Sequence, residues 1–350
     1  MTPLTIIIPT YNRPGYLRRI LDYYELKSCP YDIIVADSSR PEVKLQNRTT
    51  VENHRQLNIR FLDSFSPDLN PWYKHPRVIS TVTTEYLSFC ADDDFILLDG
   101  IMAGLNFLKT NPDFVVAHGQ YFDFHLKKTS ADEPEFSWRL GGYNSPSVDT
   151  DEPAERLRAH LDHYNPTFYG VHRTAVASVA YRALLDFKVD PILFGELLSS
   201  AITVIYGKIK RLETPHSFSN GSSPTVWPDL LKLRREPSYP PKYATFRDAT
   251  AHYLNQQSKL GAEQSNIIVD QAMKVYTKHN YPPNYRSKLR SLVKKALPEN
   301  VYAAGRTLYR RSKTSDRSAA GQSLQQHQTE FDRKVKEIES LVLRDRIEIT

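Results

Sequence analysis

Residues 84–95 read TEYLSFCADDDF, and this stretch predicts both a class of fold and the position of a site. Residues 86–90 form a short apolar run typical of a buried strand, and three carboxylates, those of Asp92, Asp93 and Asp94, follow at its carboxyl end. Open α/β sheets bind their ligands at that end of the strands. Neighbouring carboxylates ~4 Å apart repel each other by about 1 kcal/mol even in water, and Mg²⁺ or Mn²⁺ shared with substrate phosphates relieves this repulsion. The triplet therefore indicates a metal and diphosphate site, with a solvated acidic turn as the alternative.

Length and composition indicate a large intracellular protein. The chain has 350 residues, which predicts two domains or one large domain with an appendage, and its 46 basic and 40 acidic residues give a net charge of +6. Cys29 and Cys90 show no zinc spacing and suit a reducing compartment. We expect neither a spanning helix nor a signal peptide, because apolar runs are short and residues 1–9 lack a basic region. These features predict a cytoplasmic protein.

The N-terminal part of the chain alternates between strand and helix patterns. Residues 4–8 are an aliphatic run dense enough for a central parallel strand, and the turn at 9–15 ends it. Such alternation predicts an α/β fold with a parallel sheet and right-handed crossovers. The expected strands are residues 4–8, 32–36, 59–62 and 86–90, and the expected helices include residues 16–24 and 77–82.

Three motifs lie at the ends of the first, second and fourth expected strands. They read TIIIPTYNRP (residues 5–14), VADSS (35–39) and LSFCADDD (87–94). In this order they resemble the nucleotide-sugar transferases of glycosyltransferase family 2. The resemblance implies a GT-A domain over residues 1–223, with a Rossmann-like, mostly parallel sheet flanked by helices.

The resemblance also implies roles for individual residues. Asp37 would face the base of the nucleotide, Asp93 the ribose or diphosphate, and Asp94 the metal, Mn²⁺ or Mg²⁺. Arg77, on the helix before the acidic strand, is a further nucleotide candidate, and a solvated helix arginine is the alternative. The donor-binding candidates are Pro9, Thr10, Tyr11, Asn12, Arg13, Asp37, Arg77, Asp92 and Asp93.

Inverting transfer from a nucleoside diphosphate sugar requires a base for the acceptor hydroxyl and stabilisation of the departing diphosphate. The resemblance assigns the base to Glu196, at the start of an expected helix. Leu197 stands where the family usually has a second acid, so either Glu196 serves alone, another group is used, or activity is lost. In the first turn of a helix, Glu196 is otherwise a favourable partner for the helix dipole, worth roughly 0.3–1 kcal/mol.

Further candidates lie between and beyond these motifs. The resemblance implies that His216 completes the metal or diphosphate site, for which an imidazole is a sound Mn²⁺ ligand, while a plain loop histidine is the alternative. It also implies that the segment with Tyr169, His172 and Arg173 faces the acceptor. Arg173 suits bidentate binding of an anion, and an ion pair on a surface helix explains it equally.

The C-terminal third changes in composition. A proline-rich segment follows residue 223, and residues 244–260 and 267–279 read as helices. Residues 284–313 hold nine Lys or Arg against one acid, with apolar positions on one helical face. Within a helical, basic region over 224–313, this fits an anionic membrane surface, or else a docked helix with a solvated basic face. Nucleic acid is not an expected partner, because no binding motif accompanies the basic residues.

Two shorter segments complete the chain. Residues 314–328 are polar and predict a flexible connector. Residues 329–350 predict a short amphipathic helix, because Phe331, Val335, Ile338 and Val342 follow a heptad-like spacing. The spacing suggests self-association through a coiled coil.

The sequence therefore predicts a metal-dependent inverting glycosyltransferase. It would move a sugar from a nucleoside diphosphate sugar, of UDP type, to a saccharide or lipid-linked saccharide in cell-surface polysaccharide synthesis, as a cytoplasmic protein lying against the inner membrane face. A nucleotidyltransferase that makes sugar nucleotides is one alternative, although residues 10–14 lack the glycine-rich basic loop expected of it. A catalytically inactive carbohydrate- or nucleotide-binding module is the other, and Leu197 is the argument for it.

Overall fold

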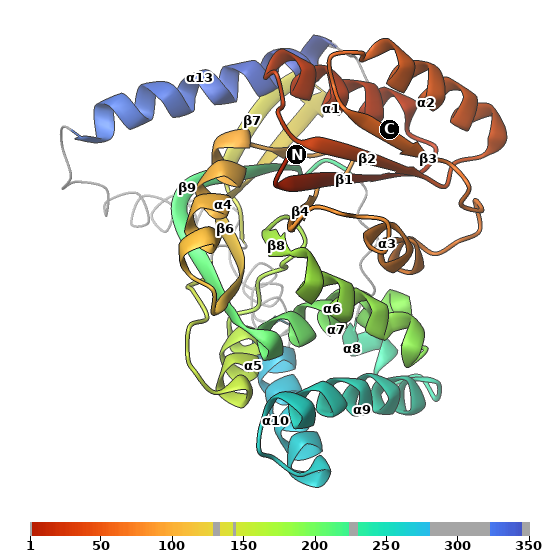
Figure 1. The fold of residues 1–350 in the computed structure, drawn as a ribbon, viewed down its shortest axis with the longest axis vertical. Helices are drawn as coiled ribbons and strands as arrows, with labels where there is room; N and C mark the ends of the chain where they lie inside the picture. Colours follow the sequence, from red (N-terminus) through yellow and green to blue (C-terminus); the bar gives the residue numbers. More distant parts are fainter. Residues whose placement is uncertain (1, 129–133, 143–144, 224–229, 281–322, 345–350) are drawn as a thin grey trace, which may run out of the picture.

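The computed structural model describes residues 2–128, 134–142, 145–223, 230–280 and 323–344. Its centre is a twisted sheet with helices on both faces (Figure 1). Helices α1 (Pro14–Leu26) and α2 (Pro41–Asn53) cover one face, and α3 (Pro71–Ile79), α6 (Thr174–Asp186) and α7 (Pro191–Tyr206) lie on the other. The α/β class expected from the alternating pattern is confirmed.

The N-terminal half of the sheet is parallel. It consists of β1 (Leu4–Thr10), β2 (Asp32–Asp37), β3 (Ile59–Leu62) and β4 (Tyr86–Phe89), in the order β3-β2-β1-β4. The aliphatic side chains of β1 are fully buried, as a central strand covered on both faces requires. The carboxyl ends of these strands consequently share one edge, at which the acidic triplet lies.

Helix α3 begins six residues before the expected start at residue 77. Pro71 stands in its first turn, and the Asn70 side chain accepts a hydrogen bond from the backbone N–H of Trp72 at 3.0 Å. A capping asparagine followed by proline favours a helix start, and it decides which side chains face inward.

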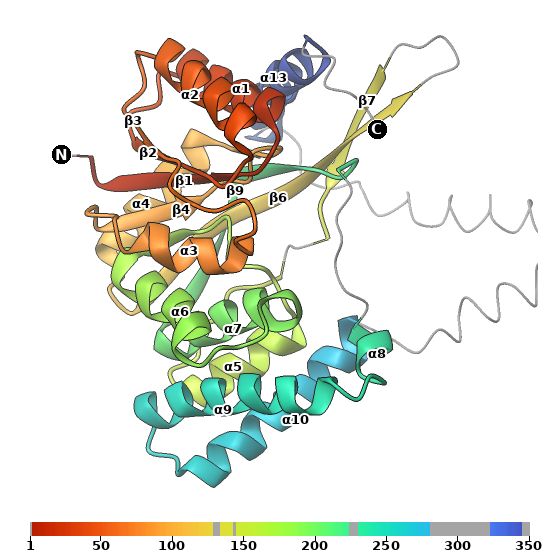
Figure 2. The same cartoon turned by 90° about the vertical axis from the view of Figure 1, so that its right-hand side faces the viewer.

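The second half of the sheet is mixed. Strand β8 (Val171–Arg173) runs antiparallel to β4, and β6 (Phe114–Lys128) runs antiparallel to β8, so the second reversal restores the direction of β4. Strand β9 (Lys208–Asn220) is parallel to β6, and its end therefore reaches the same edge as the acidic triplet. Strands β5 (Phe95–Ile96) and β7 (Pro134–Leu140) pair antiparallel with β9 and β6, and the β6–β7 hairpin extends from the body of the molecule (Figure 2). The remaining helices of this half are α4 (Leu98–Thr110) and α5 (Pro153–Asp162).

The expected helices beyond the proline-rich segment are present. After the short α8 (Leu230–Leu233), helices α9 (Tyr239–Gln257) and α10 (Ala262–Asn280) pack on α7 and α5 (Figure 2). Their buried residues, among them Phe246, Leu254 and Met273, join the hydrophobic cluster that contains Ile7 of β1. The helical extension therefore shares a core with the sheet.

Helix α13 (Ser323–Arg344) corrects one expectation for the end of the chain and bears on another. It begins at Ser323, inside the segment 314–328 expected to be a connector. Its apolar side chains, Val335, Ile338, Leu341 and Val342, are buried in a cluster with α1 and β4. The heptad-like stripe is thus covered by the chain itself, and self-association through it stays a prediction.

Ion pairs hold α13 at its middle and at its C-terminal end. Lys334 Nζ lies 2.6 Å from Asp99 Oδ2, and Arg344 pairs with Asp22 of α1. The basic segment 284–313 lies outside the described residues. Among the helices that are described, none has both the length and the apolar character required to cross a membrane.

Candidate active site

A cavity of about 600 Å³ opens at the carboxyl edge of β1 and β4. Its walls come from the loops after these strands, from α3 and α7, and from the ends of β6 and β9. Nine of the residues expected at a site line it, namely Pro9, Thr10, Tyr11, Arg13, Asp92, Asp93, Asp94, Tyr169 and Glu196.

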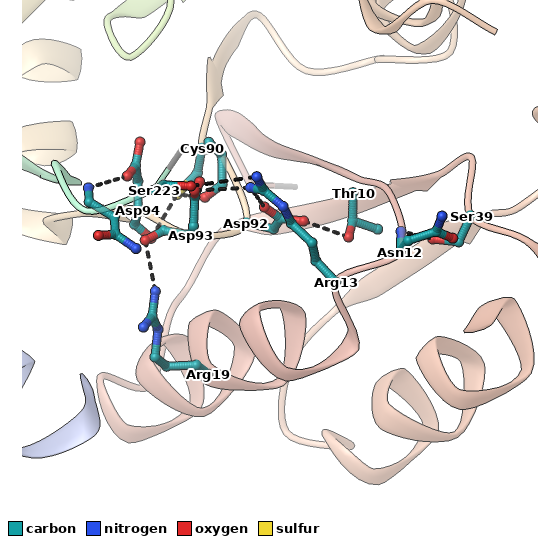
Figure 3. Close-up of polar contacts among 12 residues, drawn as sticks. Thr10, Asn12, Arg13, Arg19, Ser39, Cys90, Asp92, Asp93, Asp94 and Ser223 are labelled. Atoms are coloured by element: carbon teal, nitrogen blue, oxygen red, sulfur yellow. Dashed lines mark hydrogen bonds and ion pairs between the residues drawn. The ribbon is translucent and has the colours of Figure 1, made fainter. Parts of the chain in front are cut away.

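The acidic triplet is buried, so the alternative of a solvated acidic turn is wrong. Thr10 Oγ1 donates a hydrogen bond to Asp92 Oδ2 at 2.7 Å, and Arg13 Nη1 lies 2.9 Å from Asp93 Oδ2 and 3.3 Å from Asp92 Oδ1 (Figure 3). Burial, and then the charge of Asp93, raise the pKa of Asp92 to about 6 although Arg13 opposes this. Arg13 thus supplies one positive charge to two carboxylates.

Asp94 has neutral partners. Its Oδ1 accepts a hydrogen bond from the backbone N–H of Asn220 at 2.6 Å, and its Oδ2 accepts one from the hydroxyl of Tyr169. Burial, and then the charge of Asp93, raise the pKa of Asp94 to about 8. A carboxyl group in this environment favours a proton or a cation beside it.

Arg19 supports the triplet from behind and was not identified from the sequence. From the second turn of α1, its Nη2 donates to the backbone carbonyl of Asp93 at 2.7 Å (Figure 3). Its guanidinium lies over the rings of Tyr16 and Phe95, at 4.9 and 5.2 Å from their centroids. The only signal for it was a pair of arginines, Arg18 and Arg19, between the apolar Leu17 and Ile20. Through its hydrogen bond to Asp93, Arg19 fixes the backbone of the acidic loop.

Lys74 was also missed, and it takes the inward position on α3 that was expected of Arg77. Its Nζ donates to the carbonyls of Thr10 and Ala36, at 3.1 and 3.0 Å, and to Ser38 Oγ at 3.0 Å. Burial lowers the pKa of Lys74 to about 8. Because α3 begins at Pro71, its helical phase turns residue 74 toward the cavity and leaves Arg77 exposed.

Asn12 and Asp37 lie beside the cavity, where they join the loops after β1 and β2. The backbone of Asn12 is left-handed, with φ of 54°, and its N–H donates to Ser39 Oγ at 2.7 Å. Asp37 accepts hydrogen bonds from the backbone N–H of Ser39 at 2.7 Å and from Asn47 Nδ2 at 2.8 Å. Their direct contact with a nucleotide stays a prediction.

Glu196 lies in the second turn of α7, which corrects the expected place in the first turn. The helix begins at Pro191, and Asp190 caps it by accepting hydrogen bonds from the N–H groups of residues 192 and 193. Glu196 Oε1 accepts a hydrogen bond from the hydroxyl of Tyr164 at 2.6 Å, and burial raises the pKa of Glu196 to about 7. A carboxylate with this pKa suits a general base at neutral pH. Leu197, the next residue on α7, faces another side of the helix and is buried in the core.

His216 does not line the cavity, and its role as a metal ligand stays a prediction. His216 is fully buried, and its Nε2 lies 2.6 Å from the backbone oxygen of Tyr169. The ring packs so closely on α4 that a Cβ at Gly100 would lie 2.8 Å from Nδ1. Among the residues that the structure describes, no three metal-ligating side chains gather in the manner of a preformed metal centre.

His172 and Arg173 lie away from the cavity, which corrects their expected place at the acceptor. His172 Nε2 lies 2.6 Å from the carbonyl of Thr167 inside the core, and Arg173 donates to the carbonyls of Phe114 and Leu108 at 2.9 and 2.7 Å. The reason is strand direction. Because β8 is antiparallel to β4, its last residues lie at the amino end of β4, whereas Tyr169, before β8, lies at the site edge.

Comparisons with known proteins bear on the fold. No protein-family model matches the chain, and neither does any curated protein sequence. Among solved structures, residues 1–349 of TarS from S. aureus in complex with UDP-GlcNAc match with a TM-score of 0.50 at 14% identity, covering 79% of this chain and 73% of that one. The match to a longer structure of S. aureus TarS has a TM-score of 0.48 at 15% identity, and it covers 79% of this chain and 44% of that one. A mannosyltransferase from Pyrobaculum calidifontis, PcManGT, in complex with GDP-Man and Mn²⁺ gives 0.42 at 14% identity, covering 87% and 83%.

The match to residues 1–349 of TarS shows a likeness of fold. It confirms the fold implied by the three motifs at strand ends. At such low identity, the substrates named for these proteins are facts about those proteins alone.

Proposed function

We propose that this chain is a glycosyltransferase that moves a sugar from a nucleoside diphosphate sugar, of UDP type, to a hydroxyl of a saccharide or lipid-linked saccharide with inversion. The observation that carries the proposal is one cavity lined by the buried acidic triplet, by Arg13 and by Glu196. A leaving diphosphate needs positive charge, and an attacking hydroxyl needs a base; the cavity offers residues for both.

The acidic side of the cavity is proposed to hold the donor. Arg13 already bridges Asp92 and Asp93 and lies within reach of a diphosphate in the cavity. Thr10 and Lys74 hold the ends of β1 and β2, where a nucleotide would lie. Among these groups, Arg13 has a half-exposed side chain, so its guanidinium is accessible to a substrate in the cavity.

A divalent cation fits the acidic loop. Asp94 has only neutral hydrogen-bond donors among the partners described above, and burial together with the charge of Asp93 raises the pKa of its carboxyl. Mn²⁺ or Mg²⁺ is commonly held by one or two carboxylates together with substrate phosphates, and Asp94 with Asp93 would supply them. When bound, the cation would neutralise charge that develops on the departing diphosphate.

Glu196 is proposed as the base that takes the proton of the acceptor hydroxyl. The half-buried side chains of Trp72 and Phe168 line the cavity together with it. Their apolar surface limits the access of water to the carboxylate. Leu197 is buried, so a second acid at that position would point into the core and away from the cavity.

The test uses UDP-GlcNAc as the first probe, followed by other UDP and GDP sugars. We expect slow release of nucleoside diphosphate in the presence of Mn²⁺, a fall of about 10²–10⁴-fold in Glu196→Gln with unchanged donor affinity, and no change in the exposed control Glu263→Gln. Asp94→Ala should lose Mn²⁺-dependent binding of UDP, measured calorimetrically. Absence of nucleotide binding and of release across the panel would overturn the proposal.

The acceptor side is proposed to operate at a membrane surface. Residues 284–313, which lie outside the described part of the chain, carry nine Lys or Arg and one acid. Each basic residue near an anionic surface contributes about 1 kcal/mol before screening. Lipid-linked saccharides lie in such a surface, so this segment would bring the cavity to its acceptor.

A further inference from the structure

We propose that Tyr164 is the positioning residue for Glu196 and that helix α10 braces it through Tyr276, so the C-terminal helices belong to the catalytic unit. This inference rests on the proposed role of Glu196 as the base.

The contact between Tyr164 and Glu196 is short and shielded. The Tyr164 hydroxyl donates to Glu196 Oε1 at 2.6 Å, lies 3.5 Å from Ser200 Oγ, and belongs to a side chain that is buried. Ser200 Oγ in turn lies 3.3 Å from Thr167 Oγ1. A hydrogen bond to one carboxylate oxygen fixes the rotation of the carboxylate, which decides where its other oxygen faces in the cavity.

The need for such a partner follows from Leu197. A polar side chain at position 197 would lie in the core, so that position cannot supply a group that orients Glu196. The orienting group must come from another element. The phenol is a neutral donor whose pKa burial raises well above its ordinary value, so it keeps its proton throughout the working range of pH. It therefore holds the carboxylate without neutralising its charge.

Helix α10 determines the position of this phenol. The ring of Tyr276 meets that of Tyr164 edge to face, with centroids 5.3 Å apart and planes at 85°, and His160 of α5 makes a similar contact at 5.3 Å. Tyr276 is itself buried, and α10 packs on both α5 and α9. The orientation of the base thus depends on a residue far beyond the loops of the acidic site.

Other titratable groups also face this region. Tyr181 of α6 lies near enough to feel the charge of Glu196, and His75 of α3 lies 5.9 Å from the Tyr181 ring. Burial lowers the pKa of both His75 and His160, to about 3 and about 4, so both are neutral near pH 7. Removal of the Tyr164 hydroxyl should therefore make the carboxylate of Glu196 less stable and raise its pKa.

The first experiment measures this coupling without any substrate. Thermal unfolding is followed from pH 4 to 10 for the wild type, Glu196→Gln, Tyr164→Phe and the double variant. A buried carboxyl destabilises the fold as pH rises through its folded pKa, so the gain from Glu196→Gln should grow through that range and then level off. In the Tyr164→Phe background we expect the levelling about one pH unit higher. If the gain from Glu196→Gln levels off at the same pH in both backgrounds, the proposal is overturned.

The second experiment measures UDP-GlcNAc hydrolysis against pH. We expect the acid limb of kcat to move about one pH unit upward in Tyr164→Phe, with KM for UDP-GlcNAc unchanged, and in the same direction in Tyr276→Leu. Tyr243→Phe is the matched control, because Tyr243 of α9 donates a hydrogen bond of the same 2.6 Å length to Asp270 of α10. Its acid limb should stay in place. An equal shift in Tyr243→Phe, or none in Tyr276→Leu, would overturn the role of Tyr276.

The two experiments separate this inference from the proposed function. Coupling in the unfolding series without hydrolysis of any nucleotide sugar would support Tyr164 as the partner of Glu196 and contradict the transferase. Hydrolysis that falls in Glu196→Gln but shows an unshifted acid limb in Tyr164→Phe would contradict the positioning role and support the transferase.

Discussion

At the scale of single residues, the burial of Glu196 suits its proposed role as a base and lowers the stability of the fold. Its side chain is half-buried in the wall of the cavity beside apolar side chains, and this burial raises its pKa from 4.5 to about 7. Between these values the folded chain binds more protons than the unfolded chain, so the stability of the fold decreases as pH rises through this window. The group is suited to accept a proton for the same reason that it destabilises the fold.

Glu196→Gln should therefore raise the melting temperature at pH 8 and leave it nearly unchanged at pH 4.5. Glutamine keeps the acceptor for the Tyr164 hydroxyl but has no charge to bury. Differential scanning fluorimetry at the two pH values measures the effect, with the exposed Glu263→Gln as control. A variant that is less stable than the wild type at pH 8 would show that the carboxylate is well compensated.

At the scale of elements, α3 is the helix that joins the ends of β1 and β2 through Lys74. Lys74→Met should lower the free energy of unfolding by about 1–3 kcal/mol, because it leaves the carbonyls of Thr10 and Ala36 buried without their donor. It should also weaken the binding of UDP, measured calorimetrically. Arg77→Met on the exposed face of the same helix is the control and should change neither quantity. Weaker UDP binding in Arg77→Met, with no effect of Lys74→Met, would favour Arg77 over Lys74 as the residue of α3 that supports nucleotide binding.

Helix α13 is an element whose partner the structure reveals. Ile338→Ala should cost about 2–5 kcal/mol of stability, because Ile338 is fully buried against the chain's own core. The molecular mass in solution, measured by light scattering, should not change. Lys336→Ala, exposed on the same helix, is the control. A drop in mass with Ile338→Ala would mean that the stripe joins two copies.

At the scale of the whole molecule, α13 returns to pack on α1 after the basic segment 284–313, so truncation before that segment would also remove part of the core. Charge removal is the sharper test of membrane association. Replacing Lys288, Arg290, Lys294 and Lys295 by glutamine should abolish binding to vesicles with anionic lipid at low salt and spare UDP-GlcNAc hydrolysis. The wild type should be released by salt. If the wild type ignores such vesicles, the segment has no role at a membrane surface.

The sequence alone was sufficient for what depends on local pattern. The aliphatic run of β1, the acidic triplet after β4 and the alternation of strands and helices predicted the α/β fold and one edge of its sheet. Parallel strands bring their carboxyl ends together whatever the details of packing, so Thr10, Arg13 and Asp92 were predicted near one another without coordinates.

Only the tertiary structure decided what depends on strand direction, helix phase and distant partners. The antiparallel pairing of β8 with β4 places Arg173 away from the site. Because α3 begins at Pro71, Lys74 faces the cavity and Arg77 does not. A heptad-like spacing in α13 shows that one face must be covered, but not by what, because the apolar stripe of a docked helix and that of a coiled coil are alike in sequence. The partner of Glu196 is likewise set by packing, since Tyr164 and Tyr276 come from separate parts of the chain and meet only when α5, α7 and α10 are assembled.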